Sequence, residues 1–523
     1  MRRVKTENYL KDATISIFQA SNQGYPCVSP FHPDRFYPEY QFGGEFLSES
    51  PNPVYDAVRE SFHLLGLDKE NFGTLKWNPF GEFISPGDKV LVKPNWVLHE
   101  NHGSGGLECM ITHTSVIRVV VDYAVKALQD KGRILIADAP QWDASFDKII
   151  ESFGTDGLIE FYRKQGIAIK IVDLRSLRVK IEHGLVVSRK LNKHQAVDSR
   201  IVNLGVLSEF ESLGQKQGKL FGSDYDPGET RSHHQFGIHK YCVSKELLEA
   251  DVIINLPKLK THQKAGITVA MKNLVGINTN KNFLPHYSVG EPSLGGDEFP
   301  KSRKISQKIG RRMIRWGIEN LLARYENGFS KVARIFLKVF SRIYGLSPSG
   351  KKDYSRPGYN NKVIEKFYQV FADSSVRAGN WLGNDTVWRM IIDLNKIALY
   401  SNKKGQIQPK PQRVHFCVVD GIVGGQGNGP LSPDPISSRV IFSGFNPFCV
   451  DFVASLLMGF EPDKIPFIKN TQKVKNSPIY SGKVSEIKIV SNRKEWIKEI
   501  KPIDALKFRP PKNWERIKTW TSD

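Results

Sequence analysis

Short apolar runs alternate with amphipathic stretches along this chain from about residue 86 onward. Runs of a few apolar, often β-branched residues bounded by turn formers are typical of strands buried on both faces of a sheet. Such runs predict strands at 89–92, 133–138, 167–172, 251–256, 414–419 and 438–442.

Apolar residues at helical spacing separate several of these runs. They predict helices at 55–65, 116–128, 146–165, 384–400 and 447–458. Asn446 is expected to cap the last of these helices, and Gly66, Gly132 and Gly459 are expected to stop helices. Strands that alternate with helices favour parallel pairing, so the pattern predicts an α/β fold with a mostly parallel sheet and flanking helices.

The same pattern divides the chain into four segments. Residues 1–81 are rich in proline and are predicted to be an N-terminal extension that packs on the core. Residues 82–282 and 374–523 are interpreted as the first and second parts of the α/β core, the second part including the C-terminal tail. Residues 283–373 interrupt the rhythm between them.

Residues 283–373 are predicted to be a basic helical insertion. Twelve Lys or Arg residues fall between Lys301 and Arg342, among apolar residues at helical spacing. Two helices that pack on the main domain with solvated basic faces would explain this pattern. The alternative is a basic face that contacts an anionic membrane surface or an acidic polymer.

Three basic side chains follow the predicted strand at 251–256. Lys258, Lys260 and His262 alternate with Leu259 and Thr261, so an extended chain sends all three to one side. This is the carboxyl end of the strand, where open α/β sheets usually bind ligands. Thr261 supplies a hydroxyl to the same segment.

A second basic group follows in a segment that predicts a short helix closed by Gly276. Thr268 and Lys272 are four residues apart there, and Asn273 comes next. No acidic residue lies between Pro257 and Gly276. We therefore expect a site for a phosphate or carboxylate, with a solvated basic loop as the alternative.

Polar residues also follow other predicted strands. Lys93 and Asn95 come after 89–92, where they offer a point charge and a paired donor and acceptor, or else form a turn beside a proline. Asp420 ends the run at 414–419 and is expected to act as a base, a metal ligand or a partner that orients Lys260 or Lys272.

The residues after Asp420 contain five glycines between Gly421 and Gly429. Glycines permit close backbone approach, so this stretch is predicted to be a loop wrapped against a ligand, with Gly427 and Asn428 as substrate contacts. A flexible turn is the alternative. The glycine spacing matches neither a Walker loop nor a dinucleotide-binding turn.

Three ordered motifs resemble one family. The segments LVKPN at 91–95, NLPKLKTHQKAGITVAMKNLVGI at 255–277 and VDGIVGGQGNGP at 419–430 are similar to the landmarks of the family catalogued as domain of unknown function 362. The resemblance covers roughly residues 86–460 and confers no reaction. Some members carry iron–sulfur clusters on added cysteine motifs, so it raises the expectation of redox chemistry.

Cysteine usage and charge add two constraints. The five cysteines are scattered without any CxxC pair, which fits neither a disulfide framework nor a zinc or cluster site in this chain. An iron–sulfur cluster would therefore have to belong to a partner. The formal net charge of +21 indicates acidic partners.

The chain shows no apolar run long enough to cross a bilayer and no signal-peptide core. We expect a cytoplasmic location, with peripheral contact to the inner face of the membrane as an extension of that prediction. His99, His102 and His113 invite a metal interpretation, but their spacing matches no familiar ligand set, so no metal ligand is assigned.

The resulting hypothesis is an enzyme that binds a small phosphorylated or carboxylated metabolite. Its expected contacts are Lys93, Asn95, Lys258, Thr261, Lys272, Asn273, Gly427 and Asn428. Lys260, His262 and Asp420 are the expected catalytic residues, and the residues assign no cofactor. The alternative is a non-catalytic binding or assembly protein that uses the basic insertion. Nucleic acid is disfavoured as a partner because no stacking motif accompanies the basic residues.

Overall fold

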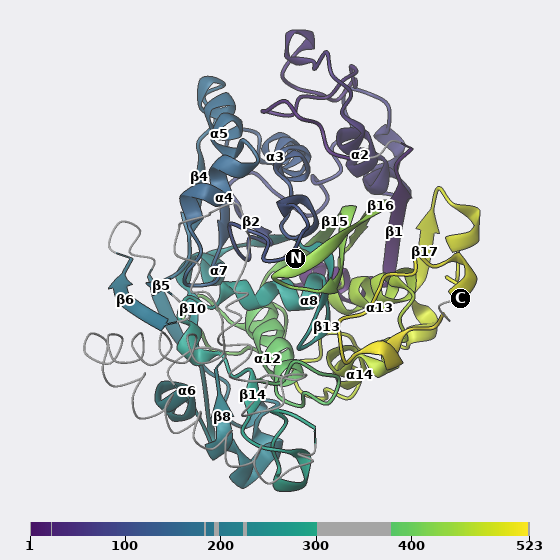
Figure 1. Ribbon diagram of the computed structural model, residues 1–523. Helices are drawn as coiled ribbons and strands as arrows, with labels where there is room; N and C mark the ends of the chain where they lie inside the picture. The colour runs from purple at the N-terminus through teal and green to yellow at the C-terminus, as the bar shows by residue number, and fades with distance from the viewer. Residues whose placement is uncertain are drawn as a thin grey trace, which may run out of the picture.

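A mixed, mostly parallel sheet forms the centre of the protein (Figure 1). The computed structural model describes residues 2–21, 24–182, 185–192, 198–222, 227–300 and 378–520. The ten-stranded sheet runs in the order β17 (Lys488–Ser491), β1 (Thr14–Gln19), β16 (Ser432–Gly444), β15 (Val414–Asn428), β11 (Val252–Leu256), β2 (Lys89–Pro94), β3 (Arg133–Asp138) and β4 (Ile169–Asp173). Strands β12 (Lys258–His262) and β13 (Gly266–Thr268) join it through the pairing of β12 with β15.

Strand direction divides the sheet into two parts. Strands β15, β11, β2, β3 and β4 are all parallel to their neighbours in this series. Strand β16 is antiparallel to both β15 and β1, and β1 is parallel to β17. The expected α/β fold is therefore confirmed, with an antiparallel hairpin on one side of its parallel strands.

Helices cover both faces of the sheet. Figure 1 shows α2 (Pro53–Leu65), α3 (Thr114–Leu128), α4 (Phe146–Ser152) and α5 (Thr155–Lys164) on one side. On the other side lie α8 (Ala270–Asn273), α12 (Val387–Tyr400), α13 (Pro447–Met458) and α14 (Pro466–Thr471). The two resulting cores share β11, because Ile254 packs in one and Ile253 in the other.

Local sequence explains where several helices begin and end. The Asn52 side chain accepts the Tyr55 N–H at the start of α2, and Gly66 ends that helix with φ 84°. Asn446 accepts two N–H groups at the start of α13, and Gly459 ends it with φ 83°. The predicted helix at 146–165 is instead two helices, because Gly154 between them has φ 58°.

Smaller elements lie beside the main sheet. They are α1 (Arg2–Lys11), α6 (Pro227–His233), α7 (Lys245–Glu249), the hairpin of β5 (Leu177–Glu182) and β6 (Leu185–Leu191), the three-stranded sheet of β7 (Ser199–Asn203), β10 (Ile238–Ser244) and β9 (His234–Gln235), and the pair of β8 (Leu220–Phe221) and β14 (Tyr287–Ser288). The β8–β14 pair ties residues 283–300 of the expected insertion to earlier parts of the chain.

Residues 301–377 lie outside the described residues, so the predicted basic helices of the insertion are not part of this description. Among the helices that the structure does describe, none combines the length and the apolarity needed to cross a bilayer.

The glycine-rich stretch after Asp420 is the clearest difference from the sequence-based expectation. It is not a loop: β15 continues through Asn428 and pairs with β16 along most of its length. The glycines allow close packing across the strand. A Cβ on Gly425 would lie 2.3 Å from the Cys109 carbonyl oxygen, and one on Gly421 would lie 2.8 Å from Val440 Cγ2.

Candidate functional site

Strand β11 leads directly into the region where most of the predicted residues gather. It is buried along its whole length between β2 and β15, as its apolar sequence predicted. After Pro257 the chain continues as β12, which pairs with β15 and forms a short antiparallel hairpin with β13. Lys258 and Lys260 are therefore held on a strand instead of a loop, and both side chains are fully buried.

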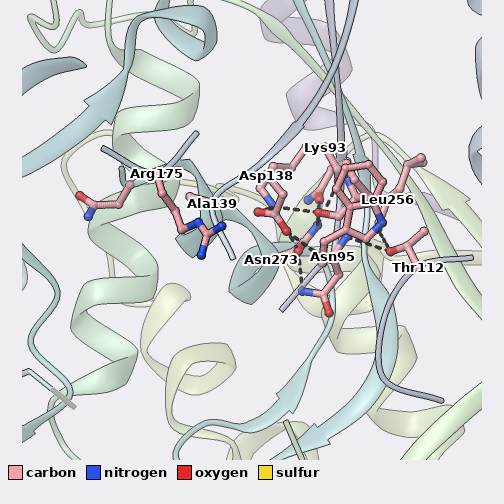
Figure 2. A network of polar contacts seen from close by, with 12 residues as sticks. Lys93, Asn95, Thr112, Asp138, Ala139, Arg175, Leu256 and Asn273 are labelled. Carbon is pink, nitrogen blue, oxygen red and sulfur yellow. Dashed lines mark hydrogen bonds and ion pairs between the residues drawn. The ribbon is translucent and has the colours of Figure 1, made fainter. Parts of the chain in front are cut away.

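The first group of polar side chains surrounds Lys93 (Figure 2). The Lys93 ammonium donates to Asp138 Oδ1 at 2.6 Å and to the Pro94 carbonyl oxygen at 2.8 Å. Asn95 donates to Asn273 Oδ1 at 2.8 Å, and Asn273 donates to Asn255 Oδ1 at 2.8 Å. These contacts join the ends of β2, β3 and β11 to Asn273, the last residue of α8.

Backbone groups complete this network. Asp138 Oδ2 accepts the Trp96 N–H at 2.7 Å, while the Thr112 hydroxyl accepts the Asn95 N–H and donates to the Leu256 carbonyl oxygen. The side-chain oxygen of Asn95 is buried and has no hydrogen-bond partner. Burial lowers the pKa of Lys93, and the Asp138 carboxylate opposes that shift.

Gly276 permits this packing. A Cβ at that position would lie 2.2 Å from Asp138 Oδ1 and 2.6 Å from the Lys93 ammonium. Its carbonyl oxygen accepts the Ala139 N–H at 3.0 Å. The glycine predicted as a helix stop therefore allows the backbone to lie directly against a buried ion pair.

A second group surrounds Asp420. Its carboxylate lies 3.1 Å from the Lys258 ammonium and accepts the His113 N–H at 2.9 Å. The Tyr25 hydroxyl donates to Asp420 at 2.5 Å and accepts from Lys258 at 2.5 Å, and its ring stacks on His113. Burial and the nearby Asp420 raise the pKa of Tyr25 well above its usual value, so the phenol is protonated at neutral pH.

The third group consists of Lys260, His262, Lys264, Lys272 and His286, which we call the basic cluster. The Lys260 ammonium donates to the Met110 carbonyl oxygen at 2.5 Å, and Lys264 donates to the Ala378 carbonyl oxygen. His262 Nδ1 accepts the Lys264 N–H at 3.0 Å, which leaves the proton of a neutral ring on Nε2.

Charges in the basic cluster act on one another. Burial, followed by Lys272, lowers the pKa of both Lys260 and His262 well below their usual values. Burial, Lys93 and Lys264 lower the pKa of Lys272 to about 8. Within the part of the chain that the structure describes, the charged neighbours that shift the pKa of Lys272 and His262 are all basic, which indicates an excess of positive potential.

Helix α8, which carries Lys272, is anchored by side chains from three other elements. The Asp451 carboxylate on α13 accepts the N–H groups of Ala270 and Met271 at 2.6 and 3.0 Å. Asn255 on β11 donates to the Ala270 carbonyl oxygen and Asn395 on α12 to that of Met271, both at 2.9 Å. The backbone at Lys272 is therefore held firmly against the sheet.

The structure does not bring every predicted site residue together. Asn428 is exposed, and its side chain accepts the Lys512 N–H. The Thr261 hydroxyl donates to the Gly427 carbonyl oxygen at 2.8 Å, so these two hold β12 against β15. Asp420 has Lys258 and Tyr25 as side-chain partners, and not the expected Lys260 or Lys272.

Several residues of the site were not singled out from the sequence as candidates. Tyr25, Lys264, Lys281 and His286 are examples. Lys281 donates to the Ala139 carbonyl oxygen at 2.7 Å, and burial lowers its pKa to about 7. The signal for Lys264 was available, because it stands two residues after His262 in the same acid-free segment. Nothing in the local sequence marks Tyr25.

Metal-binding groups do not gather here. Within the described parts of the chain, no three His, Cys, Asp or Glu residues are placed to hold a metal ion. The donor set of the basic cluster consists of ammonium and imidazole groups, and ammonium groups are hydrogen-bond donors that suit anions.

The fold and the site thus define an α/β protein with buried lysines gathered where its parallel strands end. The family model described as Domain of unknown function (DUF362) matches residues 185–455. Because that match covers more than half of the chain, the protein belongs to this family. The matched region includes β11, β12, α8 and β15, which carry most of the site.

Two individual proteins are similar to parts of the chain. A thylakoid-associated protein of Synechocystis sp. is 26% identical over 196 residues, which are 38% of this chain and 41% of that relative. The match therefore covers less than half the length of the relative. A solved structure from Thermotoga maritima aligns over 77% of this chain and 58% of its own with 11% identity and a TM-score of 0.27.

Proposed function

We propose that this protein is an enzyme acting on a small phosphorylated or carboxylated metabolite, and that the basic cluster holds the anionic group of that substrate. The observation that carries the proposal is the concentration of lysine and histidine side chains around Lys272, whose charged neighbours among the described residues are all basic. Buried charges are normally paired, because an uncompensated charge in a protein interior is costly. A bound anion would supply the missing counter-charge.

The three groups of residues described above would have different roles in binding and catalysis. Lys264, Lys272 and His286 are partly exposed, so the basic cluster is in contact with solvent there. Lys93 and Lys258 already have carboxylate partners, so they fix the ends of the strands around the site. The neutral His262 is suited to donate from Nε2 and to transfer protons during a reaction.

Anion binding by Lys272 is the first test. Inorganic phosphate and citrate should each stabilise the wild-type protein in a thermal-shift titration, and Lys272→Met should weaken binding about tenfold because one charged contact is lost. Lys469→Met is the matched control, since Lys469 is exposed on α14. Equal affinities in wild type and Lys272→Met would overturn the proposed site.

Catalysis requires a second readout. The wild-type protein and Lys272→Met should be incubated with a mixture of cellular metabolites, and each metabolite followed by mass spectrometry. Consumption of one anionic metabolite by the wild type alone would support an enzyme. Binding without any consumption would favour a non-catalytic role for the same site.

A peripheral membrane contact is a second candidate function. It is supported by the basic residues between Lys301 and Arg342 and by the name of the thylakoid-associated relative. Clusters of basic residues bind anionic lipid surfaces, and salt weakens this binding. The segment lies outside the described residues, so the argument from the segment rests on its sequence.

Vesicle sedimentation tests the membrane candidate. Vesicles that contain phosphatidylserine should retain the wild type at low salt, and purely zwitterionic vesicles should not. Replacing Arg311, Arg312 and Arg315 with glutamine should weaken retention. The control replaces three exposed lysines elsewhere, Lys469, Lys473 and Lys475, and removes the same charge. Equal loss in both triple variants would show a nonspecific effect of net charge and contradict this candidate.

A further inference from the structure

The Lys272 amine differs from the other lysines around the site. Lys93, Lys258, Lys260, Lys264 and Lys281 each donate to an oxygen atom at close range. Among the residues that the structure describes, Lys272 has no hydrogen-bond or ion-pair partner for its side-chain nitrogen. Its side chain is also partly exposed to solvent.

We propose that Lys272 is an imine-forming lysine, whose amine condenses with the carbonyl carbon of a small oxo acid held by the basic cluster. This inference rests on the proposed function, because the cluster supplies the contact for the acid group. It adds the substrate class, a carbonyl compound with a carboxylate or phosphate, and it gives one residue a covalent role.

The chemistry balances without any further reactant. The neutral amine nitrogen attacks the carbonyl carbon and gives up its two protons, and the carbonyl oxygen gains two protons and leaves as water. A C=N bond to Lys272 replaces the C=O bond of the substrate. A lysine nucleophile is activated when it is desolvated or lies beside another cationic group, and both conditions hold here.

The ionisation of Lys272 favours this role. Burial, Lys93 and Lys264 lower its pKa to about 8. At pH 7, Lys272 is therefore a free amine in about a tenth of the molecules. An ordinary lysine has only about one free amine in a few thousand molecules at that pH. Among the described residues, the charged or titratable groups near Lys272 are Lys93 on β2, Lys260 and His262 on β12, and Lys264, Lys281 and His286.

Two nearby features suit the reaction. The α8 backbone at Lys272 is fixed by Asp451, Asn255 and Asn395, so the nucleophile is positioned from a rigid element. The Thr268 hydroxyl is buried, lies opposite Lys260 across the β12–β13 hairpin and has no hydrogen-bond partner. Thr268 therefore adds an unpaired hydroxyl next to Lys260 of the basic cluster.

Reductive trapping tests the proposal on the whole protein. The wild type is incubated with glyoxylate or pyruvate and sodium cyanoborohydride, which delivers hydride to the imine carbon and leaves a stable secondary amine. Peptide mapping by mass spectrometry should place the adduct on Lys272 at a rate at least about tenfold above that of exposed lysines, in line with its larger amine fraction. Labelling should rise from pH 6 to pH 8.

Controls separate this inference from the proposed function. Lactate, which lacks the carbonyl, should give no adduct, and Lys469→Arg should label at Lys272 like the wild type. Lys272→Arg keeps the charge, so it should still bind phosphate but lose the adduct. Because mapping is done in the wild type, the result does not depend on how well that variant folds.

The outcomes are distinct. Labelling spread evenly over exposed lysines, or absent from Lys272, would overturn the imine role even where phosphate binding persists. Phosphate should also slow the labelling of Lys272 by competition. Rapid labelling of Lys272 that phosphate does not slow would uphold its reactivity and contradict the anion site.

Discussion

Lys93 and Asp138 are each almost completely shielded from water, and their opposite charges compensate each other. Lys93 Nζ lies 2.6 Å from Asp138 Oδ1, and Asp138 Oδ2 also accepts the Trp96 N–H. Removing one member of a buried pair leaves an uncompensated charge, whereas removing both leaves no charge uncompensated. The pair should therefore behave as one unit in stability measurements.

Asp138→Asn should lower the free energy of unfolding by about 3–5 kcal/mol, because Lys93 loses its counter-charge while the Trp96 N–H keeps an acceptor. The double variant Lys93→Met/Asp138→Asn should lose less than the sum of the two single changes. Urea unfolding of the four proteins measures this coupling, and strictly additive changes would contradict the pairing.

Sequence patterns marked three of the four charged residues in the Lys93–Asp138 and Lys258–Asp420 pairs, but not which of them pair. Lys93, Lys258 and Asp420 stood out because each follows an apolar run. The Tyr25 hydroxyl that bridges Lys258 and Asp420 is separated from Asp420 by 395 positions. Local periodicity carries no information about contacts over such a separation, so the sequence predicted which residues lie near strand ends but not which of them pair.

The packing of strand β15 depends on its glycines. Glycines are weak strand formers, so the stretch after Asp420 was predicted to be a loop. In the structure they allow β12 and the segment at Cys109 to approach the strand closely. The buried strands were predictable because their apolar runs satisfy both faces of the sheet, whereas the glycine positions depend on neighbours from distant parts of the chain.

Gly425→Ala should destabilise the protein by about 1–3 kcal/mol through overpacking, because the new Cβ would lie 2.3 Å from the Cys109 carbonyl oxygen and 2.9 Å from Lys260 Cβ. Gly44→Ala is the matched control, since a Cβ there would meet no atom within 4 Å. Thermal unfolding compares the two variants. An unchanged midpoint for Gly425→Ala would show that the close approach is relieved by small movements.

At the scale of the whole molecule, one sheet connects both halves of the protein. Residues near the two ends of the described chain contribute β1 and β17, which lie side by side and reach the parallel strands through β16. The residues that bind one another in the site come from β2, β3, β11, β12 and β15. Any loosening of the central strands should therefore weaken the contacts within the site.

Hydrogen exchange should reveal a gradient across this sheet. Amides of β11 and β2 should exchange most slowly, because both strands are paired on each side and buried under helices. Amides of β17 and β4, at the two edges, should exchange faster. Mass-spectrometric exchange on peptides from each strand measures this. Equal protection of β17 and β11 would indicate that the sheet opens only as a whole.

The position of β1 in the chain delays its pairing during synthesis. Its partners are Val440–Ser443 on β16 and Lys488–Ser491 on β17, so β1 leaves the ribosome more than 400 residues before either edge can be paired. At about 5–20 residues per second, this interval is on the order of half a minute. During that time the nascent chain carries an apolar strand with two open edges, which makes β1 a natural binding segment for chaperones before the sheet closes.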